Sequence, residues 1–150
     1  MKKILNDNRG VAIVEFAIIA PLLFTLIFGI IEFGFYLYNQ EMLTNAAREG
    51  ARAGIVATDP RVPATGDNSI EYVVQHYCAD HMITFGNKNN PILDPNPPSG
   101  YAADAEFGDQ LVVRVKYHYS FFVLPSFIPG IQKLQTEIEN MVATATMRYE

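Results

Sequence analysis

A long apolar segment near the N-terminus constrains this chain more than any other feature. From Val11 to Ile31 it reads VAIVEFAIIAPLLFTLIFGII, and Glu15 is the one ionisable residue within it. A helix needs roughly 20 such residues to cross about 30 Å of hydrocarbon. A core helix of this length usually carries a polar stripe, and none is present here. The segment therefore predicts a membrane-spanning helix.

A removable secretory signal is the main competing interpretation of this segment. The apolar region of such a signal typically spans about 7 to 15 residues and ends at a small-residue cleavage site. This segment is longer, and it continues without a turn into FGFYLYNQEMLTNAAREGARAG. We therefore expect the helix to be retained, to run from Val11 to about Ala57 and to bend locally at Pro21.

The flanking charges predict how the helix is oriented. Lys2, Lys3 and Arg9 precede the apolar segment, whereas Glu32 and Glu41 follow it. Basic flanks stay on the cytoplasmic side of a membrane. We therefore expect the N-terminus inside the cell and the rest of the chain exported.

Composition and motifs argue against several classes of function. The chain has 16 acidic and 11 basic side chains, and this mildly acidic balance argues against a nucleic-acid partner. Its single cysteine, Cys78, rules out an internal disulfide framework. The sequence contains no G-x-S-x-G, H-E-x-x-H or phosphate-binding G-x-x-x-x-G-K-[ST] pattern, so nothing in it indicates an enzyme.

A short amphipathic helix is expected after a loop at residues 57–69. Apolar residues recur there at helical spacing, and Asn68 or Ser69 is a suitable cap for its first turn. These apolar positions are Ile70, Val73, Val74 and Tyr77. The following segment, residues 86–100, is too rich in proline and asparagine for a regular element, and we expect a loop.

The last third of the chain predicts an antiparallel sheet. Residues 111–121 alternate between apolar and polar side chains, as does a closing strand at 141–149. Residues 101–107 alternate more weakly, and a turn at Gly108-Asp109 would join them to the next strand. Pro125 and Pro129 interrupt the pattern between the strands. The predicted fold class is therefore α+β: a long N-terminal transmembrane helix that extends into a small exported domain with a short second helix and an antiparallel sheet.

Four potential metal ligands cluster on the short helix. His76 and Asp80 lie four residues apart and so share one side, and Cys78 and His81 are close by. Structural zinc sites usually have four well-spaced ligands, and no second pair with such spacing is present. We therefore favour a capped helix end with a half-buried thiol over a metal site.

A repeat of small residues marks the far end of the long helix. Ala46, Gly50 and Gly54 recur at every fourth position, a spacing that lets another backbone approach closely. These helix-packing residues face either a neighbouring helix or the sheet of the same chain, and we favour the second arrangement.

The start of the apolar segment combines a glycine with a carboxylate five residues later. A carboxylate near a membrane needs either a partner or a solvated position. Cleavage after Gly10 would create an α-amino group on Val11, four residues from Glu15, where it could pair with that carboxylate in the same chain or in a neighbouring chain. The alternative is that Glu15 lies at the level of the lipid headgroups and has no further role.

The stretch RGVAIVEFAIIAPLLFTLIFGIIEFGFYLYNQEMLTNAAREGARAG resembles the N-terminal region of the TadE-like proteins. These are minor pilins, or pseudopilins, of tight-adherence (Tad, or Flp-type IV) pili. The alternating VVRVKYHYSF, the prolines soon after it and the closing MRYE also fit this family. Residues 58–100 are not diagnostic.

The resemblance implies that a membrane prepilin peptidase cuts the chain between Gly10 and Val11. Glu15 would then be the fifth residue of the mature chain, which this peptidase recognises. Major pilins of these systems carry Glu-Tyr at this point, whereas Glu15 is followed here by Phe16. This difference and the sizeable exported region favour a minor component of the pilus.

The resemblance also implies a pilin-like division of the chain into three parts. These are a cytoplasmic leader peptide at 1–10, a transmembrane helix with its exported extension at 11–57, and a periplasmic α+β domain at 58–150. The implied location is the bacterial inner membrane, crossed once, with the extracellular pilus as a further destination. The implied partners are the prepilin peptidase, other pilin and pseudopilin subunits and the Tad assembly platform, without a cofactor.

Two other hypotheses remain open from the sequence. In the first, the chain is an uncleaved single-pass membrane protein whose exported domain binds an envelope partner. In the second, which has less support, it is a membrane-tethered metal-dependent enzyme that uses the cluster from His76 to His81.

Overall fold

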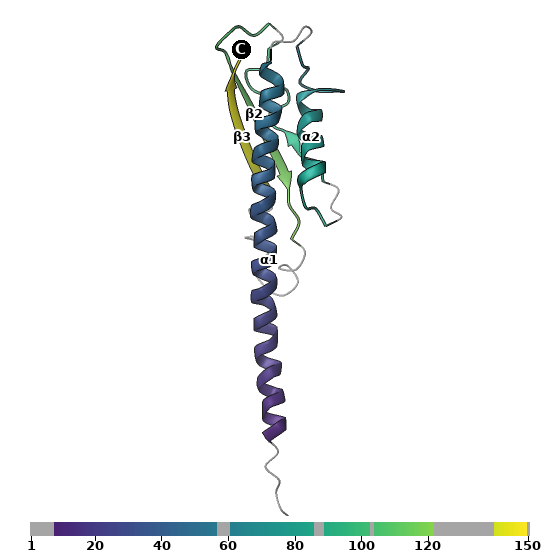
Figure 1. Ribbon diagram of the computed structural model, residues 1–150, viewed down its shortest axis with the longest axis vertical. Helices are drawn as coiled ribbons and strands as arrows, with labels where there is room; N and C mark the ends of the chain where they lie inside the picture. Colours follow the sequence, from purple (N-terminus) through teal and green to yellow (C-terminus); the bar gives the residue numbers. More distant parts are fainter. Residues whose placement is uncertain (1–7, 57–60, 86–88, 103, 122–139, 150) are drawn as a thin grey trace, which may run out of the picture.

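One long helix organises the whole molecule. The computed structural model describes residues 8–56, 61–85, 89–102, 104–121 and 140–149. Helix α1 (Asn8–Ile55) runs the full length of the described molecule, and all other elements pack around one end of it (Figure 1). These elements are α2 (Ile70–His81), β1 (Ile92–Leu93), β2 (Gln110–His118) and β3 (Asn140–Arg148). The predicted α+β class is confirmed.

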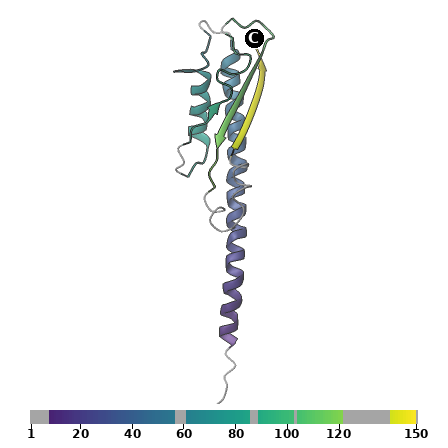
Figure 2. The ribbon, with the colours of Figure 1, turned by 180° about the vertical axis from the view of Figure 1, so that it is seen from behind.

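Helix α1 has two halves with different surroundings. Its N-terminal half has no other described element beside it, which is clear from behind (Figure 2). Its C-terminal half is buried against α2, β2 and β3, and Leu43, Ala46, Ala47 and Ala51 are fully covered. Pro21 lies inside the helix, and the Thr25 hydroxyl donates a hydrogen bond of 2.8 Å to the Pro21 carbonyl. The helix therefore continues through the proline, as membrane helices often do.

Helix α2 forms where the apolar spacing predicted it. Ser69 caps its start, because its hydroxyl accepts a 3.0 Å hydrogen bond from the Tyr72 amide. The buried side of the helix consists of Ile70, Val74 and Cys78, which are spaced four residues apart. Cys78 is therefore a core residue and is more deeply buried than its predicted half-buried position.

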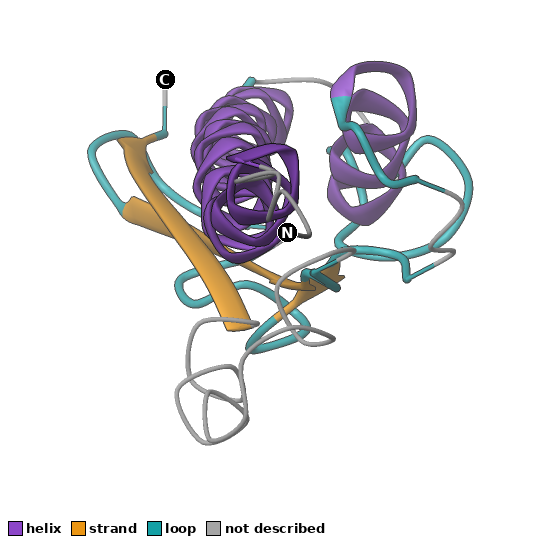
Figure 3. Cartoon of the chain, turned by 90° about the horizontal axis from the view of Figure 1, so that it is seen from below, coloured by secondary structure: helices purple, strands orange, loops and turns teal. Residues whose placement is uncertain are grey.

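The sheet is antiparallel with the strand order β1-β2-β3. Val113 of β2 lies opposite Ala145 of β3, and burial alternates along both strands. Seen along α1, both helices lie over the same side of the sheet (Figure 3). The core between them contains the odd-numbered residues of the two long strands, among them Leu111, Val113, Val115, Met141, Ala143 and Ala145.

The partner of β2 on its second edge differs from the prediction. Residues 101–107 were expected to form a strand, but their described residues contain none. The edge is instead occupied by β1, which lies inside the segment predicted to be a loop. Leu93 is buried there, the Asp94 amide donates to the Arg114 carbonyl, and Asp94 pairs with Lys116. These long-range contacts outweigh the unfavourable local composition of the segment.

Glycines form the turns that lead into β2. Gly100 has a φ of +78°, and a side chain there would overlap the backbone oxygen of Gln110. Gly108 has a φ of +95°, and its amide donates to the Tyr149 carbonyl. The predicted turn at Gly108-Asp109 is therefore present, although it follows an irregular segment. The interruption predicted at Pro125 and Pro129 lies outside the described residues.

Candidate functional site

The N-terminal half of α1 presents apolar side chains that nothing in the described chain covers. Phe16, Leu22 and Ile30 are each about two-thirds exposed or more, at 69%, 73% and 67%. In the most apolar 18-residue window of the helix, 6% of the residues are buried. A soluble core helix would bury such side chains, because each contributes about 1.5–3 kcal/mol when removed from water. Among the described residues, α1 is the one helix long and apolar enough to cross a membrane.

The predicted processing residues lie on the first turns of this exposed helix. Val11 and Phe16 are 59% and 69% exposed, and Glu15 is exposed as well. Val11 and Glu15 are four residues apart and therefore lie on one side of the helix. None of the described atoms lies within 4 Å of the position that a Cβ on Gly10 would occupy, and the φ of Gly10 is outside the left-handed region. The fold itself therefore does not require glycine at position 10.

The small residues at the other end of α1 face elements of the same chain. Ala46 is fully buried, and Gly50 and Gly54 are buried beside it. A methyl group on Gly50 would lie 2.5 Å from Cγ2 of Val74. On Gly54 it would lie 2.5 Å from Cδ2 of Leu111 and 2.7 Å from Cδ1 of Ile70. The small residues thus let α2 and β2 pack directly against the α1 backbone.

A polar sequence on α1, Tyr38-Asn39-Gln40, forms hydrogen bonds that hold later segments of the chain to the helix. Asn39 is fully buried and makes two hydrogen bonds with Ile83: its amide nitrogen donates to the Ile83 carbonyl (2.7 Å), and its oxygen accepts from the Ile83 amide (2.8 Å). Tyr38 donates to the carbonyl of His81, and Gln40 to the carbonyl of Val142. Sequence reasoning missed these contacts, although a polar run just beyond an apolar segment was a visible signal.

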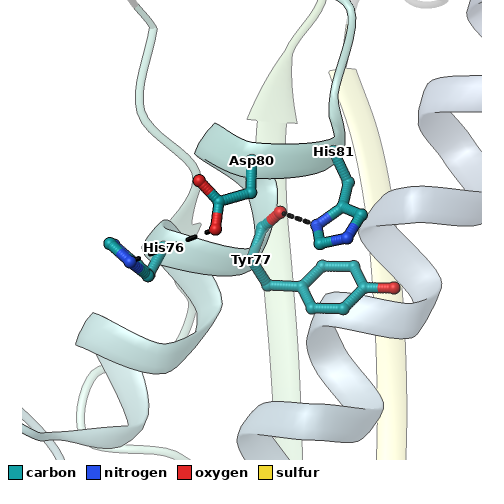
Figure 4. Close-up of polar contacts among 4 residues, drawn as sticks. All are labelled: His76, Tyr77, Asp80 and His81. Carbon is teal, nitrogen blue, oxygen red and sulfur yellow. Dashed lines mark hydrogen bonds and ion pairs between the residues drawn. The ribbon is translucent and has the colours of Figure 1, made fainter.

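The potential metal ligands on α2 do not converge on one point. His76 and Asp80 form an exposed pair, with 4.0 Å between Nε2 and Oδ2. The His81 ring stacks on Tyr77, and its Nδ1 lies 2.9 Å from the Tyr77 carbonyl (Figure 4). Cys78 lies on the buried side of the helix. No group of three or more His, Cys, Asp or Glu side chains suited to a metal ion occurs within the described residues.

Cys78 lies at a small cavity of about 230 Å³ between α2 and β2. Met82, Asn89 and Tyr117 also line this cavity. Burial raises the pKa of the Cys78 thiol to about 12, so the thiol stays protonated at neutral pH. Burial also raises the pKa of Tyr117, and the neighbouring Cys78 raises it further. The two groups are therefore neutral, and the thiol is a poor nucleophile.

Comparison with known proteins gives one match. The family model described as TadE-like protein matches residues 10–52, which begin at Gly10 and cover most of α1. No curated protein and no solved structure matches the chain. The match covers a little under a third of the chain and excludes α2 and the sheet. Over residues 10–52 the chain is therefore similar to the TadE-like family, and the resemblance noted in its sequence is confirmed for this segment.

Proposed function

We propose that this protein is a minor pilin or pseudopilin that takes part in assembly of a Tad pilus. A prepilin peptidase cuts it between Gly10 and Val11, and Glu15 becomes the fifth residue of the mature chain. The protein crosses the bacterial inner membrane once, with residues 1–10 in the cytoplasm and residues 58–150 in the periplasm. Its partners are other pilin and pseudopilin subunits and the assembly platform.

The observation that carries this proposal is the division of α1 into an exposed apolar half and a half buried in a small α+β domain. This arrangement suits a subunit that resides in a membrane and later exchanges lipid for neighbouring helices. The TadE-like match starts at Gly10, directly before the proposed cut. The open space around Gly10 is consistent with this cut, because packing of the described residues does not require glycine there.

The mature N-terminus tests the proposal. The chain is expressed in cells with and without an active prepilin peptidase, and its intact mass and N-terminal sequence are determined. We expect the mature chain to begin at Val11 only when the peptidase is active. A Gly10→Leu variant should fold normally and stay uncut, because no described atom lies within 4 Å of a Cβ at position 10.

The second candidate is an uncleaved single-pass membrane protein whose exported domain binds an envelope partner. An intact Met1 terminus in cells with active peptidase would favour this candidate and refute the pilin proposal.

If the chain is cut, copurification with sheared pili distinguishes a filament subunit from a component that remains in the assembly platform.

A further inference from the structure

The exposed apolar surface of α1 is longer than a bilayer requires. It starts at Val11 and continues past Ile31 to Leu37 and Tyr38, which are 54% and 41% exposed. At 1.5 Å per residue this surface is about 40 Å long, whereas the hydrocarbon layer is about 30 Å thick. Glu32 does not interrupt it, because the chain itself buries this side chain to 4% exposure. About 10 Å of exposed apolar helix therefore lies beyond the predicted span.

Aromatic side chains gather around α1 in this additional length. Phe35 meets Phe85 edge to face, with 4.9 Å between the ring centroids. Tyr36 contacts Phe33 at 5.8 Å and Phe121 at 6.0 Å. We call these five residues the aromatic collar. They come from α1, from the segment after α2 and from the segment after β2, and both α2 and β2 run toward the apolar half of α1 (Figure 1).

Phe85 is held in an exposed position by specific contacts. It is 56% exposed and has a φ of +44°, a left-handed conformation that is uncommon for a residue with a side chain. Two residues earlier, the double hydrogen bond between Asn39 and Ile83 fastens the chain to α1. The contact with Phe35 orients the ring beside the helix. The large apolar side chain of Phe85 is thus exposed beside Phe35 of α1 instead of being buried in the core of the exported domain.

We propose that the aromatic collar lies in the boundary between lipid headgroups and acyl chains on the outer side of the membrane. The exported domain then contacts the lipid surface directly, with no linker between it and the membrane-spanning part of α1. Aromatic residues are enriched at this boundary, because it accommodates their apolar rings next to polar groups. The collar is also continuous with the membrane-spanning surface of α1 and begins within about one helical turn of Ile31. This inference rests on the membrane insertion in the proposed function.

The chain contains no tryptophan, so single tryptophans can report the depth of chosen positions. Three full-length variants are compared: Phe85→Trp in the collar, Leu26→Trp within the span and Phe107→Trp at a distal turn, where Phe107 is 89% exposed. Each is reconstituted at low density in phosphatidylcholine vesicles that contain lipids brominated either near the headgroup or deep in the acyl chain. We expect the Phe85→Trp protein to lose about half of its emission to the shallow quencher, as an interfacial ring should.

The controls make the outcomes distinguishable. The Leu26→Trp protein should be quenched most by the deep lipid, and the Phe107→Trp protein by neither. If only the Leu26→Trp protein is quenched, the chain is inserted but the collar proposal is wrong. If none is quenched, the membrane part of the proposed function fails as well.

Phe33 provides a second, independent position on the collar. It is 49% exposed, and the Phe33→Trp protein should show the same shallow quenching as the Phe85→Trp protein. An unquenched Phe85→Trp protein with blue-shifted emission only at high protein density would indicate contact with a second copy, which overturns the lipid assignment. Unchanged near-ultraviolet circular dichroism of the tyrosines verifies that each variant is folded.

Discussion

Replacement of Gly50 by alanine tests the packing of α1 against α2. Gly50 lies inside the helix and is buried. The added methyl carbon would lie 2.5 Å from Cγ2 of Val74 and 3.4 Å from Cγ2 of Ile70. Carbon atoms pack best at about 3.5–4.0 Å, and the side chain of valine is stiff, so α2 has to move away from α1.

Two opposing effects set the size of the stability change expected for Gly50→Ala. Overpacking of a core typically costs about 1–3 kcal/mol. Alanine is more favourable than glycine inside a helix by about 0.8–1.0 kcal/mol. The expected net change for Gly50→Ala is therefore a loss of about 1 kcal/mol in the free energy of unfolding of the α+β domain.

Gly34 offers a matched control within the same helix. Nothing lies within 4 Å of the position that its side chain would occupy. The Gly34→Ala variant keeps the gain in helix propensity without the overlap, so it should be at least as stable as the parent protein. The two substitutions are chemically identical, and we expect opposite signs.

Urea titration of the full-length protein in detergent micelles measures these changes. The near-ultraviolet circular dichroism of the tyrosines reports on the core, where Tyr117 and Tyr149 are buried. A double-mutant cycle with Val74→Ala isolates the contact, because removal of the Val74 methyl groups should restore part of the stability lost in Gly50→Ala. If Gly50→Ala is as stable as Gly34→Ala and shows no coupling to Val74, the close packing of α2 on α1 is refuted.

Three other features give predictions that the same preparation can test. Asn39→Ala should destabilise the α+β domain by roughly 2–4 kcal/mol in the urea titration, because it leaves both backbone groups of Ile83 without their partner. A loss below about 0.5 kcal/mol would contradict the anchoring role. Burial raises the pKa of the Cys78 thiol to about 12. At pH 8 this thiol should therefore react with a colorimetric disulfide reagent on the order of 100-fold more slowly in the native than in the urea-unfolded protein. Equal rates would show that the thiol is accessible. The pKa of Asp94 is lowered in the folded protein, chiefly because its carboxylate is hydrogen-bonded to Lys116. Its contribution to stability is therefore present above about pH 4, the pKa of aspartate in the unfolded chain. This contribution is lost as the pH falls through the lowered pKa of the folded state. A Lys116→Met variant should lose less stability than the parent between about pH 6 and pH 3, by pH-dependent urea titration, and an identical pH profile would contradict the pairing.

Elements with a regular pattern of burial could be predicted from the sequence. The strand at Gln110–His118 buries one face, and its residues therefore alternate in polarity. Helix α2 was predicted from the spacing of Ile70, Val73, Val74 and Tyr77. Ile70 and Val74 are buried as expected, whereas Val73 and Tyr77 are half-buried and Cys78 completes the buried side. Each of these patterns is local, since burial of one face imposes a period on consecutive residues.

Features that depend on distant partners could not be predicted in this way. Strand β1 has two residues, too few to show a period, and it exists because β2 offers an open edge. The role of Asn39 depends on the position of Ile83, which is 44 residues away in the chain. The aromatic collar likewise joins three separate segments. At the N-terminus the proposed processing site rests on the resemblance to a family, because the packing of the described residues gives Gly10 and Glu15 no role.

The uninterrupted course of α1 from Asn8 to Ile55 has a mechanical consequence. In the proposed arrangement, the α+β domain is fixed to the same rigid helix that lies in the membrane, so it cannot swivel about a linker. Each residue of a helix turns the rod by about 100° and lengthens it by about 1.5 Å. If α1 contacts a neighbouring helix in the bilayer, the side of α1 that makes this contact would therefore set the direction in which the α+β domain faces. A single residue deleted between Leu22 and Ile30 would redirect the domain by more than a quarter of a circle while leaving every contact inside it intact.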